Sequence, residues 1–378
     1  MLRTRVALAV ARGKTHKMKA KLLIAAAALL GAPAIAQTAQ TAAPSPGEIV
    51  AASPAGEWVA IQPIDLLVMD LTPDRAGQAR RVVIQLIPAP FSQPWTANIR
   101  ALAKARWWDG LAIVRAQDNY VVQWGDPNAE EAEEARPLPT GITATTEADY
   151  AIEDLLAIPD ARGRPRLNYT LGAMMMRNAM IAAKGSTRFP EMEQALMSGA
   201  VPPLDIKMPD VGDTYAPMTS LVMGWPIAGG RHGSDRVAEG FWPVHCYGTV
   251  GVGRGMPPDA GSGAELYTVI GHAPRHLDRN IAVVGRVIEG IEHLSTLPRG
   301  TEALGFYKTR EERTPINSIR LGAEVPGLPA YQYLSTEGET FARYAEARAN
   351  RRDPFFIVPA GGADVCNIPV PVRRAPAP

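Results

Sequence analysis

One arginine stands out among the residues that could do chemistry, because Arg115 lies inside an otherwise apolar run. The runs LAIVRA (111–116) and YVVQW (120–124) have the β-branched and aromatic composition of short strands, with turn-forming residues between them. A buried arginine is most often ion-paired scaffolding, for instance with Asp126 or Glu265, and the spacing alone favours that reading. The alternative is a fixed, permanently charged donor that stabilises an electron-rich atom in a binding or catalytic site.

Other patterns that often carry chemistry fail in their context. GVGRG at 251–255 is followed by a Met-Pro-Pro sequence, whereas a phosphate-binding loop must open a helix. His272 and His276 have the spacing of a zinc-binding helix, but Pro274 interrupts it and the glutamate of that motif is missing. No serine lies in a Gly-x-Ser-x-Gly elbow. The sequence therefore predicts neither ordinary hydrolase chemistry nor a cofactor or metal site.

The elements that must position Arg115 are short and mostly strand-like. Helical spacing of apolar residues predicts two short helices, at 92–105 and 288–297. Strand-like runs occur at 66–71, 81–88, 111–116, 120–124, 247–255, 265–271, 281–290 and 314–322. Since strands and helices do not alternate regularly, the pattern favours a closed antiparallel barrel over a parallel α/β sheet.

The N-terminal residues predict export. Residues 1–36 carry seven Lys and Arg and no acidic residue, and the apolar run at 22–36 ends in Ala34-Ile35-Ala36. This is the pattern of a cleaved secretory signal peptide, and the run is too short for a membrane anchor. We expect a mature chain that begins near Gln37, is periplasmic or secreted, and has no membrane span after signal cleavage.

Charge and cysteine content describe the mature chain further. The full chain has a formal net charge of +1, so removal of the seven cations leaves −6. A domain of that sign lacks the basic surface that binds nucleic acid. In an oxidising compartment, Cys246 and Cys366 are compatible with one disulfide, or with two separate buried thiols.

Composition divides the chain into a signal peptide (1–36), a Pro- and Ala-rich linker (37–56), a main domain (57–322) and a C-terminal extension (323–378). Within the main domain, residues 128–244 differ in texture and are expected to be an insert. The insert has helix-like stretches at 148–157 and 171–185, and the extension has a polar helical pattern near 339–352.

Taken in order, four stretches resemble the cyclophilin-type peptidyl-prolyl cis-trans isomerases. RVVIQLIPAPFSQPWTANIRALAKARWWDG (81–110) is similar to the family's opening strand, turn and first helix. LAIVRAQDNYVVQWGDP (111–127) is similar to its F-H-R-V-x-x-x-F-x-x-Q-G-G-D block. HCYGTVGVGRG (245–255) and GAELYTVIGHAPRHLDRNIAVVGRVIEG (263–290) resemble the H-x-x-G strand and the stretch from G-S-Q-F-F-I to the final V-F-G-x-V. The resemblance covers about 66–127 and 245–322. It implies an eight-stranded antiparallel barrel with two short helices, here with a partly helical insert and a C-terminal extension.

The resemblance also implies a site. Arg115 takes the position of the catalytic arginine, and Gln123 that of the glutamine beside it. The positions that line the substrate pocket in the family are occupied by Tyr120, Val121, Gly253, Arg254, Glu265, Leu266, Tyr267, His276, Leu277 and Ile281. The chain departs from the family pattern at Val114, where a histidine is usual, at Leu266 and Ile281, and at Trp124, where a glycine is usual.

The implied activity is proline isomerisation, with proline-containing unfolded or partly folded polypeptides as partners and without a cofactor. With the ordered resemblance, the catalytic reading of Arg115 outweighs the ion-pair reading. The alternative function is a non-catalytic cyclophilin-like chaperone or interaction module, in which the altered pocket binds polypeptides but turns them over poorly.

Overall fold

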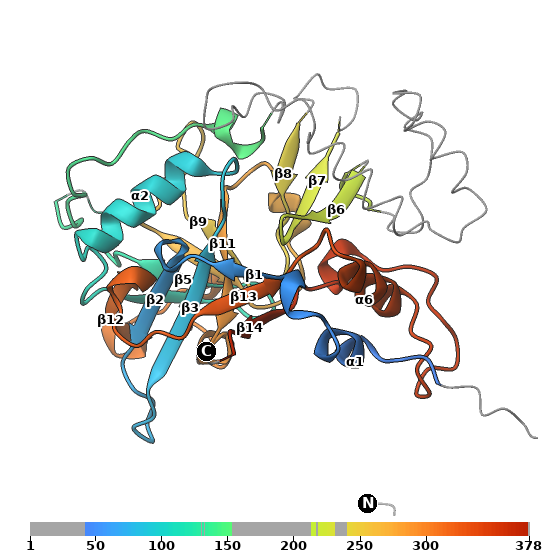
Figure 1. The fold of residues 1–378 in the computed structure, drawn as a ribbon. Coiled ribbons are helices and arrows are strands. Elements are labelled where there is room, and N and C mark those ends of the chain that lie inside the picture. Colours follow the sequence, from blue (N-terminus) through green and yellow to red (C-terminus); the bar gives the residue numbers. More distant parts are fainter. Residues whose placement is uncertain are drawn as a thin grey trace, which may run out of the picture. The chain divides into compact units, whose positions relative to one another are not determined.

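Eight antiparallel strands close into a barrel in the computed structural model of the chain, which describes residues 42–129, 131, 133–152, 213–216, 218–230 and 240–376 (Figure 1). Around the barrel the order is β10 (Leu266–Val269), β5 (Val121–Gly125), β4 (Ala112–Ala116), β12 (Thr314–Leu321), β2 (Leu66–Leu71), β3 (Arg80–Leu86), β11 (Val283–Glu289) and β9 (Thr249–Val252). Pairing of β9 with β10 closes the ring. The predicted eight-stranded antiparallel barrel is confirmed.

Alternation along the strands fills the barrel with apolar side chains. On β5, Val122 and Trp124 lie in the main core, while the neighbouring Val121 and Gln123 lie on the other face. On β10, Leu266 lies opposite Trp124 and belongs to the same core. Successive side chains of a strand point to opposite faces, so each strand contributes one row to the core and one row to the outer surface.

Helix α2 (Gln93–Lys104) covers the barrel core because its apolar residues recur at helical spacing. Trp95, Ile99 and Leu102 are fully buried, and each buried side chain of this size contributes roughly 1.5–3 kcal/mol. The Trp95 indole N–H is satisfied by the carbonyl of Gly261 at 2.8 Å. The second helix, α5 (Glu292–Ser295), is shorter than predicted, because β11 extends through the first residues of that segment.

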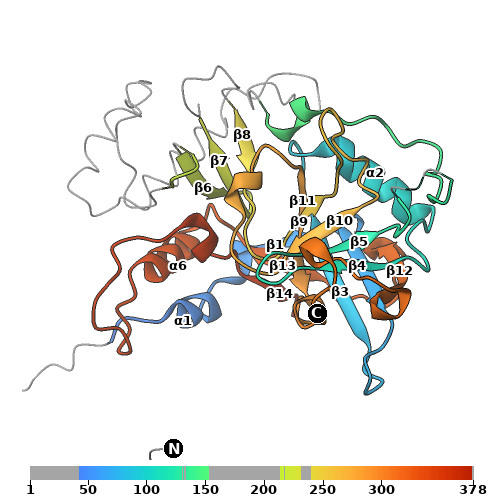
Figure 2. The same cartoon turned by 180° about the vertical axis from the view of Figure 1, so that it is seen from behind.

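A second, three-stranded sheet lies outside the barrel, in the order β1 (Trp58–Ile61), β13 (Tyr331–Leu334) and β14 (Val372–Arg374). It combines the start of the main domain with two segments of the C-terminal extension. Helix α6 (Glu339–Ala349), which corresponds to the predicted polar helix, lies beside α1 (Pro46–Ala51) in both views of the ribbon (Figures 1 and 2).

Helix α1 lies within the segment that the sequence suggested was a linker. Its N-terminus is a capping box, in which the Glu48 N–H donates to Ser45 Oγ at 3.3 Å and the Ser45 N–H donates to the Glu48 carboxylate at 2.7 Å. The Ser45 N–H and the Ser45 hydroxyl both donate to the Glu48 carboxylate, and these two hydrogen bonds lower the pKa of Glu48. The sequence Ser-Pro-Gly-Glu carries this signal, which the proline- and alanine-rich composition obscured.

The described part of the insert contains a three-stranded sheet of β6 (Met218–Val222), β7 (Trp225–Gly229) and β8 (Phe241–Pro243). Trp225 and Ile227 of this sheet pack against Ile87 and Phe91, at the end of β3 and in the turn before α2. Of the stretches expected to be helical, 148–150 belongs to the short 3-10 helix η3 (Glu147–Tyr150), and the rest lies almost entirely outside the described residues.

Cys246 and Cys366 form a disulfide bond, with their Cα atoms 5.2 Å apart. The bond connects the segment between β8 and β9 to the 3-10 helix η9 (Val365–Asn367) of the C-terminal extension. The extension is therefore attached to the rest of the protein by a covalent link as well as by the β13 and β14 pairings.

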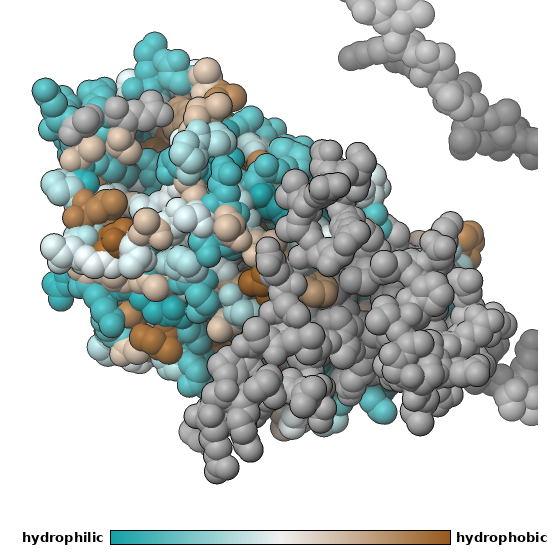
Figure 3. All heavy atoms as spheres, turned by 90° about the horizontal axis from the view of Figure 1, so that it is seen from above, coloured by the Kyte–Doolittle hydropathy of each residue, from teal (hydrophilic) through white to brown (hydrophobic). Residues whose placement is uncertain are grey.

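The proposed signal peptide, 1–36, lies outside the described residues. None of the helices in the described ranges has the length and hydropathy that a bilayer-spanning helix needs. On the face seen in Figure 3, the described surface is mostly hydrophilic, and its hydrophobic residues form separate patches.

Candidate functional site

The candidate site is a row of residues across the outer face of four adjacent barrel strands. Arg115 on β4 is paired in register with Gln123 on β5, which is paired with Tyr267 on β10. Tyr267 is in turn paired with Gly251 on β9. A Cβ atom at Gly251 would lie 2.4 Å from the Tyr267 ring, so the missing side chain makes room for the tyrosine.

A β-bulge sets the direction of Arg115. The register of β4 against β5 shifts between Ile113 and Arg115, so that Val114 is the extra residue. Val114 lines the same groove as Arg115, and its backbone carbonyl accepts a hydrogen bond from the Tyr307 N–H at 3.0 Å. Bulges of this kind change the direction of a side chain and are common beside functional sites.

The hydrogen bonds of the Arg115 guanidinium go to neutral acceptors. Nε donates to the Leu304 carbonyl at 2.7 Å, Nη1 donates to Gln123 Oε1 at 3.3 Å, and Nη2 donates to Gln117 Oε1. Within the described ranges no carboxylate forms an ion pair with Arg115, so the alternative reading, a pairing with Asp126 or Glu265, is not found there. Three of the five N–H donors of the guanidinium are used.

The surroundings leave the charge of Arg115 partly desolvated. Burial lowers the pKa of the guanidinium from its ordinary value, because the cation is less well hydrated there than in water. Two aromatic rings face it, with its Cζ atom 5.6 Å from the centre of Tyr120 and 5.2 Å from that of Phe306. The result is a half-buried cation that stays available to an incoming acceptor.

Glu265 orients the side-chain amide of Gln123. The amide Nε2 donates to Glu265 Oε2 at 2.8 Å, which leaves Oε1 to face Arg115. Glycines allow this close approach: a Cβ at Gly125 would lie 2.7 Å from Glu265 Cγ, and one at Gly253 would lie 2.9 Å from its Cβ. Glu265 therefore acts on Arg115 through Gln123 rather than as a direct ion-pair partner.

Beside the arginine lies an apolar cluster that is separate from the barrel core. Val121, Tyr267 and Val269 are its buried members, and Tyr120, Leu277 and Ile281 pack against them. Two barrel strands, the turn before β5, and the 3-10 helix η5 (Arg275–Leu277) with the residues that follow it all contribute to this cluster. An apolar surface next to a cation suits a small apolar ring better than a charged side chain.

Both features belong to one groove of about 1010 Å³. Ten of the predicted site residues line it: Arg115, Tyr120, Val121, Gln123, Gly253, Arg254, Glu265, Tyr267, Leu277 and Ile281. The Arg254 guanidinium is folded onto backbone carbonyls, donating to Asn280 at 3.0 Å and to Gly255 at 2.8 Å. Beyond the apolar cluster the groove is also lined by eight residues at or just before the start of the insert: Asp126, Pro127, Asn128, Ala129, Glu131, Ala135, Arg136 and Leu138.

Two predicted site residues lie elsewhere. Leu266 is fully buried in the barrel core, because it alternates with Tyr267 along β10 and must face the opposite side. Its assignment to the pocket is therefore wrong. His276 is exposed and does not line the groove, although its ring is stacked with that of Tyr120 at a centroid distance of 6.5 Å.

Three residues that contact Arg115 were missed by reasoning from the sequence. Gln117 lies two residues after Arg115, so the alternation of side chains along a strand could have placed it on the same face. Leu304 and Phe306 come from a loop nearly 190 positions away, and neither carried a local signal. In the part of the chain that the structure describes, no group of three or more His, Cys, Asp and Glu side chains is arranged to hold a metal ion.

Comparison with solved structures finds cyclophilins. The cyclophilin AquaCyp293 from Hirschia baltica matches with a TM-score of 0.51 and 17% sequence identity, over 84% of this chain and 92% of that one. A cyclophilin-type peptidyl-prolyl cis-trans isomerase from Cryptosporidium parvum, in the presence of the dipeptide Ala-Pro, matches with a TM-score of 0.31 and 10% identity, over 67% of this chain and 98% of that one.

A second structure of the Cryptosporidium parvum protein gives a TM-score of 0.30 and 11% identity, over 68% of this chain and 97% of that one. No family model matches the sequence. No curated protein matches it either. The match to AquaCyp293, at 17% identity, shows that the chain has a cyclophilin-type fold.

Proposed function

We propose that this chain, which has the cyclophilin-type fold, is a peptidyl-prolyl cis-trans isomerase that assists the folding of exported proteins. The observation that carries the proposal is the half-buried guanidinium of Arg115, which is held by neutral acceptors beside an apolar depression. A cation that is positioned but not neutralised can act on a substrate, whereas an ion-paired arginine acts mainly on its partner.

The chemistry needs only a fixed donor and a dry pocket. An X-Pro amide rotates over a barrier of about 20 kcal/mol, because resonance holds the bond planar. In the twisted state the lone pair is localised on the proline nitrogen, and a guanidinium N–H that donates to this nitrogen stabilises it. Neither planar isomer offers that lone pair, so the interaction lowers the barrier rather than only tightening binding.

In this proposal the apolar cluster holds the proline ring and excludes water from the reacting amide. Tyr120, Val121, Tyr267, Leu277 and Ile281 supply its walls. The backbone around Gly253 and Arg254 and the amide of Gln123 would hold the peptide on either side of the ring. Arginine suits the donor position better than lysine, because its planar N–H groups keep their direction and their charge.

The exported location is also a proposal, and it rests on the basic, then apolar, then Ala-x-Ala pattern of residues 1–36. The disulfide between Cys246 and Cys366 agrees with an oxidising compartment. N-terminal sequencing of the protein recovered from a secreting host should begin near Gln37. Residues 18–36 form a complete signal of this kind by themselves, so translation could also begin at Met18. Recovery of a chain that starts at Met1 or Met18 would contradict export by cleavage.

A second candidate function is a non-catalytic polypeptide-binding module. The observation in its favour is the extent of the groove, which beyond the apolar cluster is lined by the eight residues from Asp126 to Leu138 named above. A long groove can hold an extended chain whether or not the X-Pro bond in it is isomerised.

One assay separates the two functions. The cis-to-trans rate of an X-Pro peptide is measured with the mature protein, and the dissociation constant of the same peptide is measured alongside. Acceleration that is lost in Arg115→Ala supports the isomerase. Tight binding without acceleration would establish the binding module instead. Tyr120→Ala should raise the dissociation constant of the peptide more than it lowers the isomerisation rate of the bound peptide, because Tyr120 supplies the pocket and not the charge.

A further inference from the structure

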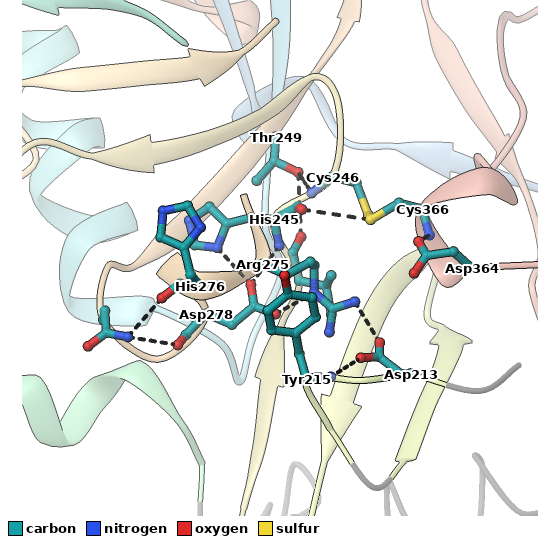
Figure 4. A network of polar contacts seen from close by, with 12 residues as sticks. Asp213, Tyr215, His245, Cys246, Thr249, Arg275, His276, Asp278, Asp364 and Cys366 are labelled. Carbon is teal, nitrogen blue, oxygen red and sulfur yellow. Dashed lines mark hydrogen bonds and ion pairs between the residues drawn. A yellow bond between two sulfur atoms is a disulfide. The ribbon is translucent and has the colours of Figure 1, made fainter. Parts of the chain in front are cut away.

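The pocket residue Tyr267 is the outer end of a chain of buried polar contacts, called the relay below, which runs through His245, Asp278 and Arg275 to Asp213. Figure 4 shows the relay from His245 to Asp213. Its hydroxyl lies 2.9 Å from Nε2 of His245, and Nδ1 of the same imidazole lies 2.9 Å from Oδ1 of Asp278. The His245 side chain is completely buried and that of Asp278 is 5% exposed. The His245 backbone N–H also donates to Asp278 Oδ1, at 3.0 Å, so one carboxylate oxygen holds both ends of the residue.

The chain continues from the barrel into the insert. The second oxygen of Asp278 accepts from Nε of Arg275 at 2.6 Å, and Nη1 of Arg275 donates to Oδ2 of Asp213 at 2.5 Å. The side chains of Arg275 and Asp213 are each only 3% exposed. The ring of Tyr215 lies over the guanidinium at 5.3 Å, and its backbone N–H donates to the other Asp213 oxygen at 2.7 Å.

The hydrogen-bond directions follow from the chemistry of the end groups. An ionised aspartate only accepts, so Nδ1 of His245 carries a hydrogen and donates to Asp278. In the neutral imidazole Nε2 is then an acceptor, and the Tyr267 hydroxyl must donate to it. Burial raises the pKa of Tyr267, which keeps the hydroxyl protonated and able to donate. The buried side chains of His245 and Asp278 therefore fix the orientation of Tyr267 in the pocket.

Arg275 is the residue on which this orientation depends. It is a buried cation between two buried carboxylates, and Asp278 alone holds both the guanidinium and the imidazole. A buried charge that loses a partner moves toward its remaining partner or toward water. Leu277, which forms part of the pocket wall, lies between Arg275 and Asp278 in the sequence. A shift of Arg275 would therefore move two sides of the apolar pocket.

We infer that Asp213, which the insert contributes, is a positioning residue of the proline pocket and acts through Arg275, Asp278 and His245 on Tyr267. The inference rests on the proposed isomerase function, since it assigns the insert a role in binding the proline ring. Asp213 does not line the groove, so its effect is on the shape of the pocket and not on the charge that faces the substrate.

The test compares Asp213→Asn with Glu147→Gln, which neutralises an exposed insert carboxylate away from the relay. Asp213→Asn should raise KM and the dissociation constant of an X-Pro peptide about fivefold, with kcat within about twofold of wild type. Glu147→Gln should change none of these values. Asp213→Glu, which keeps the carboxylate, should recover part of the affinity and guards against a folding defect in the asparagine variant.

A double-mutant cycle with Tyr267→Phe tests whether Asp213 acts through the tyrosine. Tyr267→Phe keeps the ring and removes the hydroxyl that joins it to His245. If the relay operates, Asp213→Asn raises the dissociation constant by a smaller factor in the Tyr267→Phe protein than in the wild type, and the remainder reflects the shift of Leu277. The inference would be overturned if Asp213→Asn raised the dissociation constant by the same factor with and without the Tyr267 hydroxyl. An Asp213→Asn variant that binds peptide normally and is only less stable to heat would also overturn it.

The proposed function and the relay can fail separately. A wild-type protein that binds the peptide without isomerising it overturns the isomerase, and the relay is then decided on dissociation constants alone. A wild-type protein that binds no proline peptide overturns both.

Discussion

Arg115 and Gln123 face each other in the register of β4 and β5, and Nη1 of the guanidinium donates to the amide Oε1 across 3.3 Å. The pairing explains how a half-buried cation is held in place without a carboxylate partner. A neutral acceptor fixes the direction of the N–H groups but leaves the positive charge to act on a substrate.

Arg115→Ala should lower kcat/KM for an X-Pro peptide by about tenfold or more, which corresponds to about 1.4 kcal/mol of lost transition-state stabilisation. Arg115→Lys should recover little, because an ammonium group does not reproduce the planar donors. The measurement is the cis-to-trans rate, with melting curves beside it. Arg81→Ala, which removes an exposed arginine of β3 that pairs with Asp70, is the matched control. Full activity with reduced stability in Arg115→Ala would show that the arginine is scaffolding.

Gln123→Glu should make kcat/KM fall as the pH rises, and the wild type should not show this fall. The introduced carboxylate would lie beside Arg115 and beside Glu265, whose Oε2 is now 2.8 Å from the amide nitrogen. Two adjacent carboxylates raise each other's pKa, so one of them stays protonated in acid and ionises as the pH rises. Ionisation neutralises the arginine, and kcat/KM should therefore fall with rising pH. A pH–rate profile of Gln123→Glu, with the exposed Gln78→Glu as control, checks this.

Arg374→Ala should lower the melting temperature of the protein near neutral pH but not in acid. Arg374 forms an ion pair with Glu289 at 2.6 Å between β14 and β11, and its hydrogen bond is the main cause of the lowered pKa of Glu289. A carboxyl group with a depressed pKa stabilises the fold above its unfolded-state pKa, and this stabilisation disappears as the pH falls through the folded-state pKa.

Both partners of this pair are partly exposed, so the decrease in melting temperature should be small and should shrink further in salt. Melting curves near neutral pH and in acid test the prediction, with Arg352→Ala, from the exposed pair with Glu346, for comparison. A difference between Arg374→Ala and wild type that persists below the pKa of Glu289 would contradict it.

Removal of the disulfide should destabilise the protein without abolishing the site. The bond spans 120 residues, and loss of a native disulfide costs about 2–5 kcal/mol of unfolding free energy. The Cys246→Ser/Cys366→Ser double variant should unfold at lower denaturant concentration, to about the same extent as the wild type in reductant. Mass spectrometry of the unreduced wild type provides the control, since two free thiols would mean that the bond does not form.

The sequence by itself determined the barrel and most of the candidate site, because those features leave local signals. Short runs of β-branched and aromatic residues predicted the segments that form β2, β3, β4 and β5, and helical spacing predicted α2. An arginine between two strand-like runs, together with the ordered resemblance, indicated Arg115 and its groove. Ten of the twelve proposed catalytic and pocket positions line that groove.

Only the tertiary structure decided which face each residue occupies and which distant residues meet there. Alternation along a strand separates its side chains into two faces but does not show which face is turned to the core. In β10 the pairing of Leu266 with Trp124 places Leu266 in the core and Tyr267 in the groove. The acceptor for Arg115 on Leu304 and the Asp213 partner of Arg275 lie far from their partners in the sequence. No local periodicity encodes such contacts, because they form only when barrel closure and insert packing bring separate segments together.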